Sequence, residues 1–568
     1  MSPGARRWGA VAAGGVLAAV VATVTVARVQ GTLARQARRE TIAAAIPGAR
    51  DDGFVGSGAC TACHPSASAT WHDSYHRTMT QPASAEAMQA RFDGQPLADG
   101  TVPERDDDGF WFREGQTRRQ VVMITGSHHM QVYWHAADDG SLQSATWAWL
   151  KDPAPGRFVP NESTLLRPPG EPTTFTWNRV CIKCHAVAGN PGWDEASATV
   201  DSEVAELGIA CEACHGPGAA HVQAHRNPLH RYAAYDDAAA DPTIVHPGRL
   251  DAAASSEVCG QCHSISIFVD DEGWTTSGRT HVMSQPLAHA PMSTWARVAR
   301  HPLRADQPWI EPVLEVDPDF FVDRFWYDGM VRVSGREYNG MIESACFGSG
   351  ELSCLTCHSM HDAAADDQLR PAAIDESVCT GCHGAIAANV DGHAHHTPAQ
   401  ASCMDCHMPH TTYGLLKGIR SHLIDAPSVA VAQQTGRPTA CALCHLDRSP
   451  QFVADALTQW YGHPAAPEQT DGLAASAQGV LAGDAGQRAL WAWHLGWSRA
   501  QGSDGLRAQL FEILARDPYP AVRLVAERAR ARLGDAGATL RRATYPLDTA
   551  TIEAWLGQRD QRPIRLAE

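Results

Sequence analysis

The chain has 568 residues, of which 44% are hydrophobic and 19% charged, so it is too long for one small core and too apolar to be disordered. About two to four globular units are expected for this length. Acidic residues outnumber basic ones by 63 to 46, and the resulting formal charge of −17 argues against a dedicated binder of nucleic acid or anionic lipid.

An uncharged run over residues 8–27 follows Arg6 and Arg7, and its 20 residues would just cross a bilayer as a helix. A cleaved signal peptide usually has a shorter apolar stretch and a better small-residue exit, although cleavage remains the alternative. The sequence therefore predicts a signal anchor over 1–30 and a polar stalk over 31–55. We expect the chain to be anchored in the inner (cytoplasmic) membrane with its bulk in the periplasm.

One short motif, Cys-x-x-Cys-His, dominates the rest of the chain. The residue frequencies predict roughly 0.02 chance occurrences, yet the motif occurs eight times and uses 16 of the 17 cysteines. Only Cys346 is left over. The copies are Cys60-Cys63-His64, Cys181-Cys184-His185, Cys211-Cys214-His215, Cys259-Cys262-His263, Cys354-Cys357-His358, Cys379-Cys382-His383, Cys403-Cys406-His407 and Cys441-Cys444-His445.

Between the first and second motifs, in a unit predicted over 56–180, the chain reads as a small β-rich insertion. The apolar run 121–124 and the alternation over 130–134 predict strands, with Gly126 and Asp139-Gly140 as turns.

The next two predicted units are defined by how the motifs are spaced. Motifs two to four and a long connector occupy 181–353, in which 326–333 is a further candidate hairpin. Motifs five to eight occupy 354–450, where the loops are too short for independent domains. Whatever these four motifs bind must therefore lie close together.

The motifs end before the last segment, 451–568, which is rich in Ala, Leu, Arg and Trp. Apolar positions over 490–495 and 510–514 recur near helical spacing, and the run 517–520, Asp-Pro-Tyr-Pro, interrupts them before 522–533 resumes. This pattern is typical of a HEAT-type helical pair. One or two such units alone are marginally stable, so we expect the segment to pack against the preceding part.

Each motif places two thiols a helical turn apart and an imidazole directly after the second. This geometry suits two thioether bonds to one haem, with the histidine on one face of its iron. A disulfide framework needs no histidine after every pair, and structural zinc does not explain the invariable trailing histidine. The sequence therefore predicts eight covalently attached haems c, in a mainly α fold with extensive irregular loops, a β-rich insertion and a HEAT-like C-terminal segment.

Eight irons offer eight opposite axial positions, and 20 histidines remain outside the motifs. With histidine in surplus, methionine ligation is not needed. Alternatives within the same clusters are His72, His128, His225, His393 and His395. The predicted distal ligands are His76, His129, His221, His361, His396, His410 and His422.

The haems change both the folding argument and the charge. Residues 354–445 hold too few large apolar side chains to collapse alone, so the chain without haem should be largely unfolded there. Propionates and iron together would take the charge from −17 to about −25. The complement is a redox partner protein with a basic patch, or a quinol-linked donor at the membrane.

Several strings resemble multihaem cytochromes of the cytochrome c-554 and doubled-CxxCH superfamily, which includes octahaem hydroxylamine oxidoreductases. They are the run from Cys211 to His221, the Cys403-Met-Asp-Cys-His-Met-Pro pattern followed by Arg420-Ser-His422, and the stretch 71–76. The resemblance spans about 56–446. It implies that His76, His221 and His422 are distal ligands, and that the haems stack in alternating parallel and perpendicular pairs.

Two departures from this superfamily bear on function. A C-x-x-C-K haem, which marks the nitrite-reducing branch, is missing, and apart from Lys183 inside a motif only Lys151 and Lys417 could substitute. The hydroxylamine-oxidising branch cross-links a tyrosine to its catalytic haem, and nothing in this sequence singles out such a tyrosine.

The leading hypothesis is therefore a membrane-tethered octahaem electron carrier whose irons are mostly bis-histidine ligated. The alternative is a reductase of a small nitrogen or sulfur oxyanion with one five-coordinate haem. Cys346 motivates it, because eight residues before Cys354 it could be a third thioether, a distal thiolate or a reactive thiol beside the fifth haem. A buried unpaired cysteine is the plainer interpretation. A third hypothesis, from the HEAT analogy, is a wired scaffold that docks a partner through its C-terminal helices.

Overall fold

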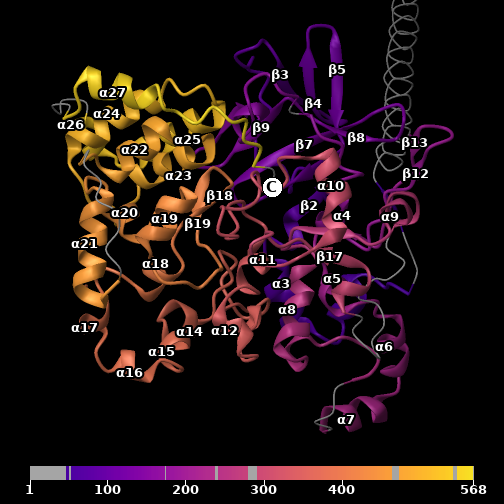
Figure 1. The fold of residues 1–568 in the computed structure, drawn as a ribbon. Helices are drawn as coiled ribbons and strands as arrows, with labels where there is room; N and C mark the ends of the chain where they lie inside the picture. Colours follow the sequence, from indigo (N-terminus) through magenta and orange to yellow (C-terminus); the bar gives the residue numbers. More distant parts are fainter. Residues whose placement is uncertain are drawn as a thin grey trace, which may run out of the picture.

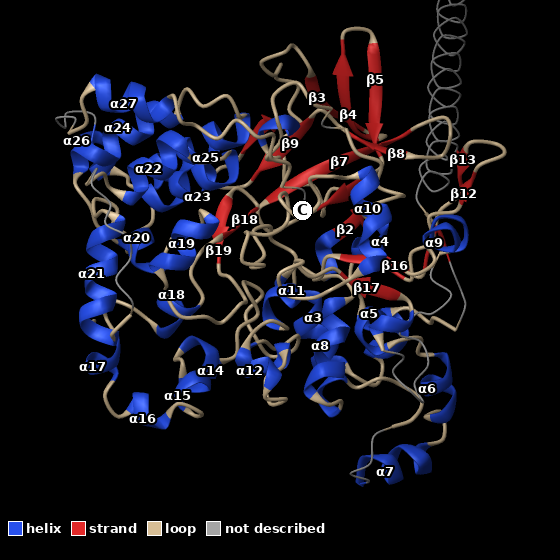
Figure 2. Ribbon diagram, viewed as in Figure 1, coloured by secondary structure: helices blue, strands red, loops and turns tan. Residues whose placement is uncertain are grey.

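A computed structural model describes residues 47–49, 53–172, 174–236, 241–278, 291–463, 472–540 and 546–566. The predicted anchor over 1–30 lies outside these residues, and the stalk contributes only the short strand β1 (Gly48–Ala49) before residue 53. No helix in the described ranges is long and apolar enough to span a bilayer. The fold is mixed, with 39% helix and 15% strand, rather than mainly α as expected (Figures 1 and 2).

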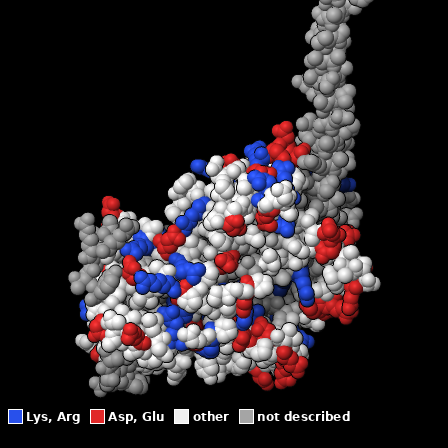
Figure 3. Space-filling view, turned by 90° about the horizontal axis from the view of Figure 1, so that it is seen from above, with Lys and Arg blue, Asp and Glu red and all other residues white. Residues whose placement is uncertain are grey.

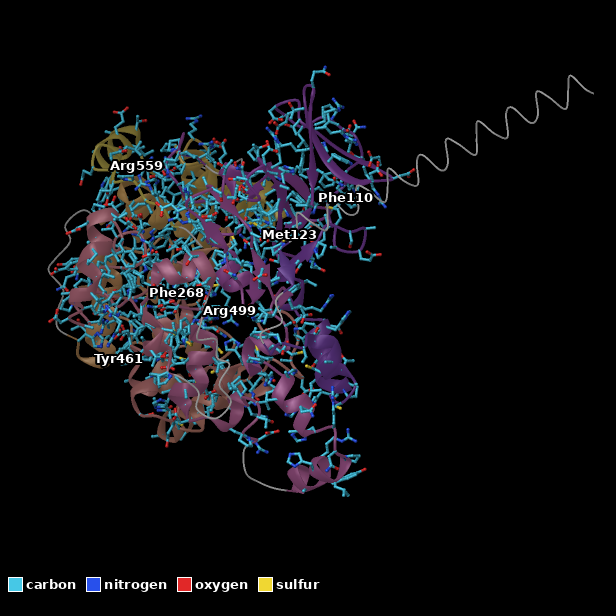
Figure 4. All side chains as sticks on the ribbon, turned by 90° about the vertical axis from the view of Figure 1, so that its right-hand side faces the viewer. Phe110, Met123, Phe268, Tyr461, Arg499 and Arg559 are labelled. Atoms are coloured by element: carbon cyan, nitrogen blue, oxygen red, sulfur yellow. The ribbon has the colours of Figure 1, made fainter. Side chains whose placement is uncertain are left out.

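The predicted β-rich insertion is present as two antiparallel sheets. Strands β3, β4 and β5 form one sheet, and β10-β9-β7-β6-β2, with β8 on β7, form the other. Both strand predictions are confirmed, and Gly126 adopts φ 89° at the turn between β6 and β7. Figure 4 labels Phe110 of β4 and Met123 of β6 in this part. The strands are β2 (Thr80–Pro82), β3 (Val102–Asp106), β4 (Gly109–Glu114), β5 (Thr117–Val121), β6 (Met123–Thr125), β7 (Met130–Ala136), β8 (Leu142–Ser144), β9 (Trp147–Leu150) and β10 (Arg157–Pro160).

The sheets have a core of their own because aromatic side chains from several strands meet between them. Phe92, Phe112, Tyr133 and Phe158 contact one another with ring centroids 5.1 to 6.2 Å apart. Such edge-to-face and tilted packing adds to the burial energy of the rings. The insertion is therefore a structural platform that does not depend on a cofactor for its core.

Short strand pairs outside the insertion account for the rest of the β content. The candidate hairpin over 326–333 is a tight turn, in which the Trp326 amide donates to the Met330 carbonyl at 2.7 Å. The remaining pairs are β1–β14 (Glu203–Val204), β11–β15 (Ala186–Val187 and Glu206–Leu207), β12–β13 (Trp193–Asp194 and Thr199–Val200), β16–β17 (Ser266–Phe268 and Ala296–Val298) and β18–β19 (Thr412–Gly414 and Lys417–Ile419).

Short helices carry the motifs, most of them only one turn long. The spacing of two thiols and an imidazole within five residues requires no more than one turn. These and the intervening helices are α2 (Ser57–Thr61), α3 (Pro65–His72), α4 (Ile182–His185), α5 (Cys211–His215), α6 (Ala219–Ala224), α7 (Pro228–Asp236), α8 (Ala252–Gly260), α9 (Asp271–Ser277), α10 (Glu311–Val316), α11 (Glu337–Met341), α12 (Ala345–Gly348), α13 (Cys354–Cys357), α14 (Pro371–Ile374), α15 (Ser377–Thr380), α16 (Gly384–Ala387), α17 (Val390–Ala394), α18 (Cys403–His407), α19 (Val429–Thr435) and α20 (Ala440–Cys444).

Longer helices form the C-terminal part, which is coloured orange to yellow in Figure 1. Pro520 begins α25, where its fixed φ suits the first helical position, and α23 packs against α25. A buried ion pair between Arg332 and Asp484, 2.7 Å long with both side chains 4% exposed, joins this part to the motif-bearing part. The helices are α21 (Pro450–Tyr461), α22 (Ala475–Ala482), α23 (Ala485–Leu495), α24 (Asp504–Leu514), α25 (Pro520–Arg532), α26 (Asp535–Leu540) and α27 (Thr549–Leu556).

Removing the Asp517 carboxylate is expected to destabilise the C-terminal helices strongly. Asp517 accepts two hydrogen bonds from the Arg488 guanidinium, at 2.6 and 3.1 Å, and both side chains are almost fully buried. Asp517→Ala would leave a buried unpaired charge, which costs about 3–5 kcal/mol. Thermal unfolding followed by circular dichroism measures the loss. The control is Glu512→Ala, since its pair with Arg530 is 3.6 Å long and partly exposed and should change stability by less than about 1 kcal/mol.

Candidate haem-binding sites

In each motif the two cysteines and the histidine lie on a single helical turn, which a backbone hydrogen bond closes in several of them. In the first motif the His64 amide donates to the Cys60 carbonyl at 2.9 Å, and the same bond recurs in other motifs at 2.8 to 3.0 Å. None of the 17 cysteines is paired in a disulfide. The thiols and imidazoles are thus available together, as covalent haem attachment requires.

Six of the eight motif histidines face a second histidine ring across a gap. With metal–imidazole bonds of about 2.0 Å on both faces of one iron, the two ring centroids lie about 6 Å apart. The observed separations fit this value, so the gap accommodates an iron between two imidazoles. The pairs are His64–His221 at 6.2 Å, His263–His76 at 6.4 Å, His215–His361 at 6.5 Å, His358–His422 at 6.3 Å, His407–His393 at 6.1 Å and His445–His396 at 6.1 Å. The ring of His246 lies at the same 6.5 Å from His215 as that of His361.

The ring nitrogens that point away from the gaps are also engaged. Nδ1 of five of these rings lies 2.8 to 3.2 Å from a backbone carbonyl, as in His215 to Val245, His358 to Asp367, His407 to Asp425, His396 to Ala394 and His422 to Arg420. A hydrogen bond at Nδ1 fixes the tautomer that leaves Nε2 free to bind metal. Burial lowers the pKa of His76 to about 4, so its ring is neutral, as ligation requires.

Two motif histidines have no such partner among the described residues. His185 of the second motif and His383 of the sixth face no histidine ring in the described ranges at the separation seen in the six pairs. Burial lowers the pKa of His185 as well.

The structure places two of the predicted distal ligands away from the motif histidines. His129 stacks on His128 with ring centroids 3.7 Å apart, and burial together with Lys417 lowers the pKa of His129 to about 3. His410 packs against Trp493 and Trp497 at 5.0 and 5.1 Å.

His393 faces the seventh motif, where the sequence left several neighbouring histidines as alternatives. Tyr461 at the end of α21, labelled in Figure 4, donates to the His393 carbonyl at 2.5 Å, and its ring lies 6.2 Å from that of His393. This contact holds the loop before His396, which faces the eighth motif. One turn of chain thus serves two neighbouring motifs.

Contacts between motifs define a row on the N-terminal side. Helices α2 and α5 pack against each other, which joins motifs one and three. The Gln261 side chain donates to the Ala213 carbonyl at 2.8 Å, which joins motifs three and four. Motif two also meets motif four, because the Cys184 thiol lies 3.9 Å from a carbonyl of that motif. Motif four is therefore a junction with motif two as its side branch.

The row continues from the junction to the C-terminal side. Helices α8 and α13 pack together and join motifs four and five, and α14 packs between the helices of motifs five and six. Glu376, at the start of α15, accepts from the amides of Cys403 and Met404 at 3.0 and 3.1 Å, which joins motifs six and seven. Helices α18 and α20 then join motifs seven and eight.

Cys346 lies on α12 and is half-buried. It lies near Cys379 of the sixth motif, and a role beside the fifth haem stays a prediction. Its carbonyl accepts from the Ser349 hydroxyl at 2.7 Å.

Replacing Cys346 by Ser is expected to leave haem content and absorption spectrum unchanged, because every haem already has two motif thiols and a motif histidine. Intact mass and visible spectroscopy check this. Cys382→Ser is the matched control, since it removes one thioether bond of the haem expected at the sixth motif. Loss of a haem or a changed low-spin spectrum in the Cys346 variant would instead make this thiol a ligand or a third attachment point.

Comparison with known proteins gives structural neighbours only. No family model and no curated protein matches the chain. The chain is similar to the outer cell wall cytochrome OcwA, with 18% identity and a TM-score of 0.49 over 89% of this chain and all of that one. An undecahaem S-layer cytochrome of Carboxydothermus ferrireducens gives 15% identity and 0.35 over 89% and 68% of the two chains. The octahaem sulfite reductase MccA of Wolinella succinogenes gives 14% identity and 0.28 over 65% and 55%.

Proposed function

We propose that this protein is an octahaem c-type cytochrome that moves electrons along a row of covalently bound haems. The observation that carries the proposal is the set of six histidine pairs. In each pair one motif imidazole and one imidazole from elsewhere in the chain have the ring separation that an iron bound to both of them requires. An iron held on both faces has no position for a substrate. These six haems would therefore serve outer-sphere electron transfer.

The row has two ends, and their positions suggest a direction. The first motif begins only a few residues after the stalk, so its haem would lie nearest the proposed membrane anchor and would receive electrons from a quinol-linked donor or a redox protein. The eighth motif, on α20, lies against the C-terminal helices. The haem-bearing part would face the periplasm. On the face seen in Figure 3 acidic and basic side chains are interspersed, while the net charge of −17 favours a partner with a basic patch.

The test uses the purified, exported full chain. Intact mass should show eight added haems, and fewer than seven would refute the assignment of the motifs. Electron paramagnetic resonance of the oxidised protein should be dominated by low-spin ferric signals, as six or more bis-histidine haems require. A spectrum made up mainly of high-spin iron would overturn the proposal.

A second function is favoured by the position of the second motif. It contacts motif four but lies off the path from motif one to motif eight, so a haem there would end a branch. A haem at the end of a branch is better placed to react with a substrate than to pass electrons on to another haem. It would make the protein a reductase of a small nitrogen or sulfur oxyanion. Binding of carbon monoxide by the reduced protein, lost in Cys181→Ser/Cys184→Ser, would support this function. No carbon monoxide binding would exclude it.

A further inference from the structure

Two of the facing histidines differ from the others in what holds their Nδ1 atoms. His221 Nδ1 lies 3.0 Å from Oδ2 of Asp241, and His263 Nδ1 lies 2.8 Å from Oε2 of Glu337. Of the other Nδ1 contacts of these pairs, five run to backbone carbonyls, and His361 Nδ1 lies 3.5 Å from the Thr70 hydroxyl. A carboxylate is a much stronger acceptor than a carbonyl, because it carries a full charge.

Both carboxylates are fixed in place by further hydrogen bonds. The other oxygen of Asp241 accepts from the amide and the hydroxyl of Thr243 at 2.7 and 2.5 Å. Oε1 of Glu337 accepts from the Gly335 amide at 2.9 Å. Asp241 also lies 2.6 Å from Nε2 of His225, so it bridges two imidazoles. Neither carboxylate can turn away from its histidine without breaking these bonds.

We propose that Asp241 and Glu337 are positioning residues that lower the reduction potentials of the first and fourth haems below those of the haems whose histidines bond backbone carbonyls. The inference rests on the proposed haem ligation. A carboxylate draws the Nδ1 proton toward itself and makes the imidazole a stronger donor to iron. A stronger axial donor stabilises the ferric state, and second-shell hydrogen bonds are a recognised control of haem potential.

The first and fourth haems, whose potentials would be lowered, occupy particular places in the row of haems. The first haem is the end nearest the stalk, and the fourth is the junction where the branch to the second haem leaves. Electrons would not rest on a low-potential junction. They would pass from it to the fifth haem or to the second, so the junction would distribute electrons and the other haems would store them.

The test is a redox titration of the holoprotein followed by visible and paramagnetic resonance spectroscopy. Asp241→Asn and Glu337→Gln keep the shape and remove the charge. Because an amide has only one accepting oxygen, each variant can still accept from the histidine but loses the second accepting oxygen. Each should raise the potential of one haem by about a tenfold change in its one-electron equilibrium, which is about 59 mV. Haem content and low-spin character should not change. Asp139→Asn is the control, because Asp139 makes the same turn with Ser141 and bonds no histidine. Unchanged potentials in both variants would overturn the proposal.

Two further measurements distinguish a failure of this proposal from a failure of the proposed haem ligation. His221→Ala should convert the first haem to high spin, and if it does not, the ligation itself is wrong, independently of the carboxylate. His221, His225 and Asp241 also form a group whose ligand atoms lie within 4.8 Å of one another. One equivalent of zinc in the purified protein, lost in Asp241→Asn, would overturn the tuning role in favour of a metal site.

Discussion

Removing the fourth haem is expected to cut electron transfer between the two ends of the protein, whereas removing the second should leave it intact. The difference follows from the contacts between motifs, because motif four touches motifs two, three and five, and the Cys184 thiol of motif two lies against motif four. The variants are Cys259→Ser/Cys262→Ser and Cys181→Ser/Cys184→Ser. Each loses one haem, so they are matched in haem number.

Electrons can be introduced at one end to distinguish the two variants. A photosensitiser attached to Ser66→Cys, in a Cys346→Ser background, would inject them beside the first haem, since Ser66 lies two residues after His64 in α3 and is exposed. After a flash, the variant without the fourth haem should reduce only the first and third haems on the millisecond scale. The variant without the second should reduce all seven that remain. Equal and complete reduction in both would mean that the row does not pass through motif four.

Local sequence patterns predicted the parts of the fold that have a period. The alternation over 130–134 is strand β7, and the apolar spacing over 490–495 lies in α23. The mixed character of the fold was not predicted because pairs such as β12–β13 and β18–β19 are only two or three residues long. A strand of that length shows no alternation, and its partner is set by the surrounding packing.

The motif residues were predictable, but their partners depend on tertiary structure. His361 and His410 each stand three residues after a motif histidine, yet His361 faces His215 while His410 packs against two tryptophans of the C-terminal helices. Equal spacing therefore does not fix equal roles. Asp241 and Glu337 carry no sequence signal, because a lone acidic residue becomes informative only when the fold brings an imidazole to it.

The distribution of buried apolar side chains shows where haem must serve as core. Between Ile342 and Thr412, all within the described ranges, Ala373 is the one hydrophobic side chain that is buried in the polypeptide alone. By contrast, α22 to α25 bury Val480, Leu490 and Leu510, among others, in one continuous cluster. Residues 342–412 bury too little apolar surface to offset the entropy that the chain loses on folding, whereas α22 to α25 bury enough.

Exporting the chain without haem attachment is therefore expected to unfold residues 342–412 completely while α22 to α25 keep their structure. Hydrogen exchange measured by mass spectrometry should show no protection in the first segment of the apoprotein and clear protection in the helices. The holoprotein, in which both should be protected, is the control. Porphyrins fill the missing core and tie each motif to a distant histidine, so their loss removes both the apolar surface and the crosslinks. Protection of 342–412 without haem would show that this segment is held by contacts other than the cofactor.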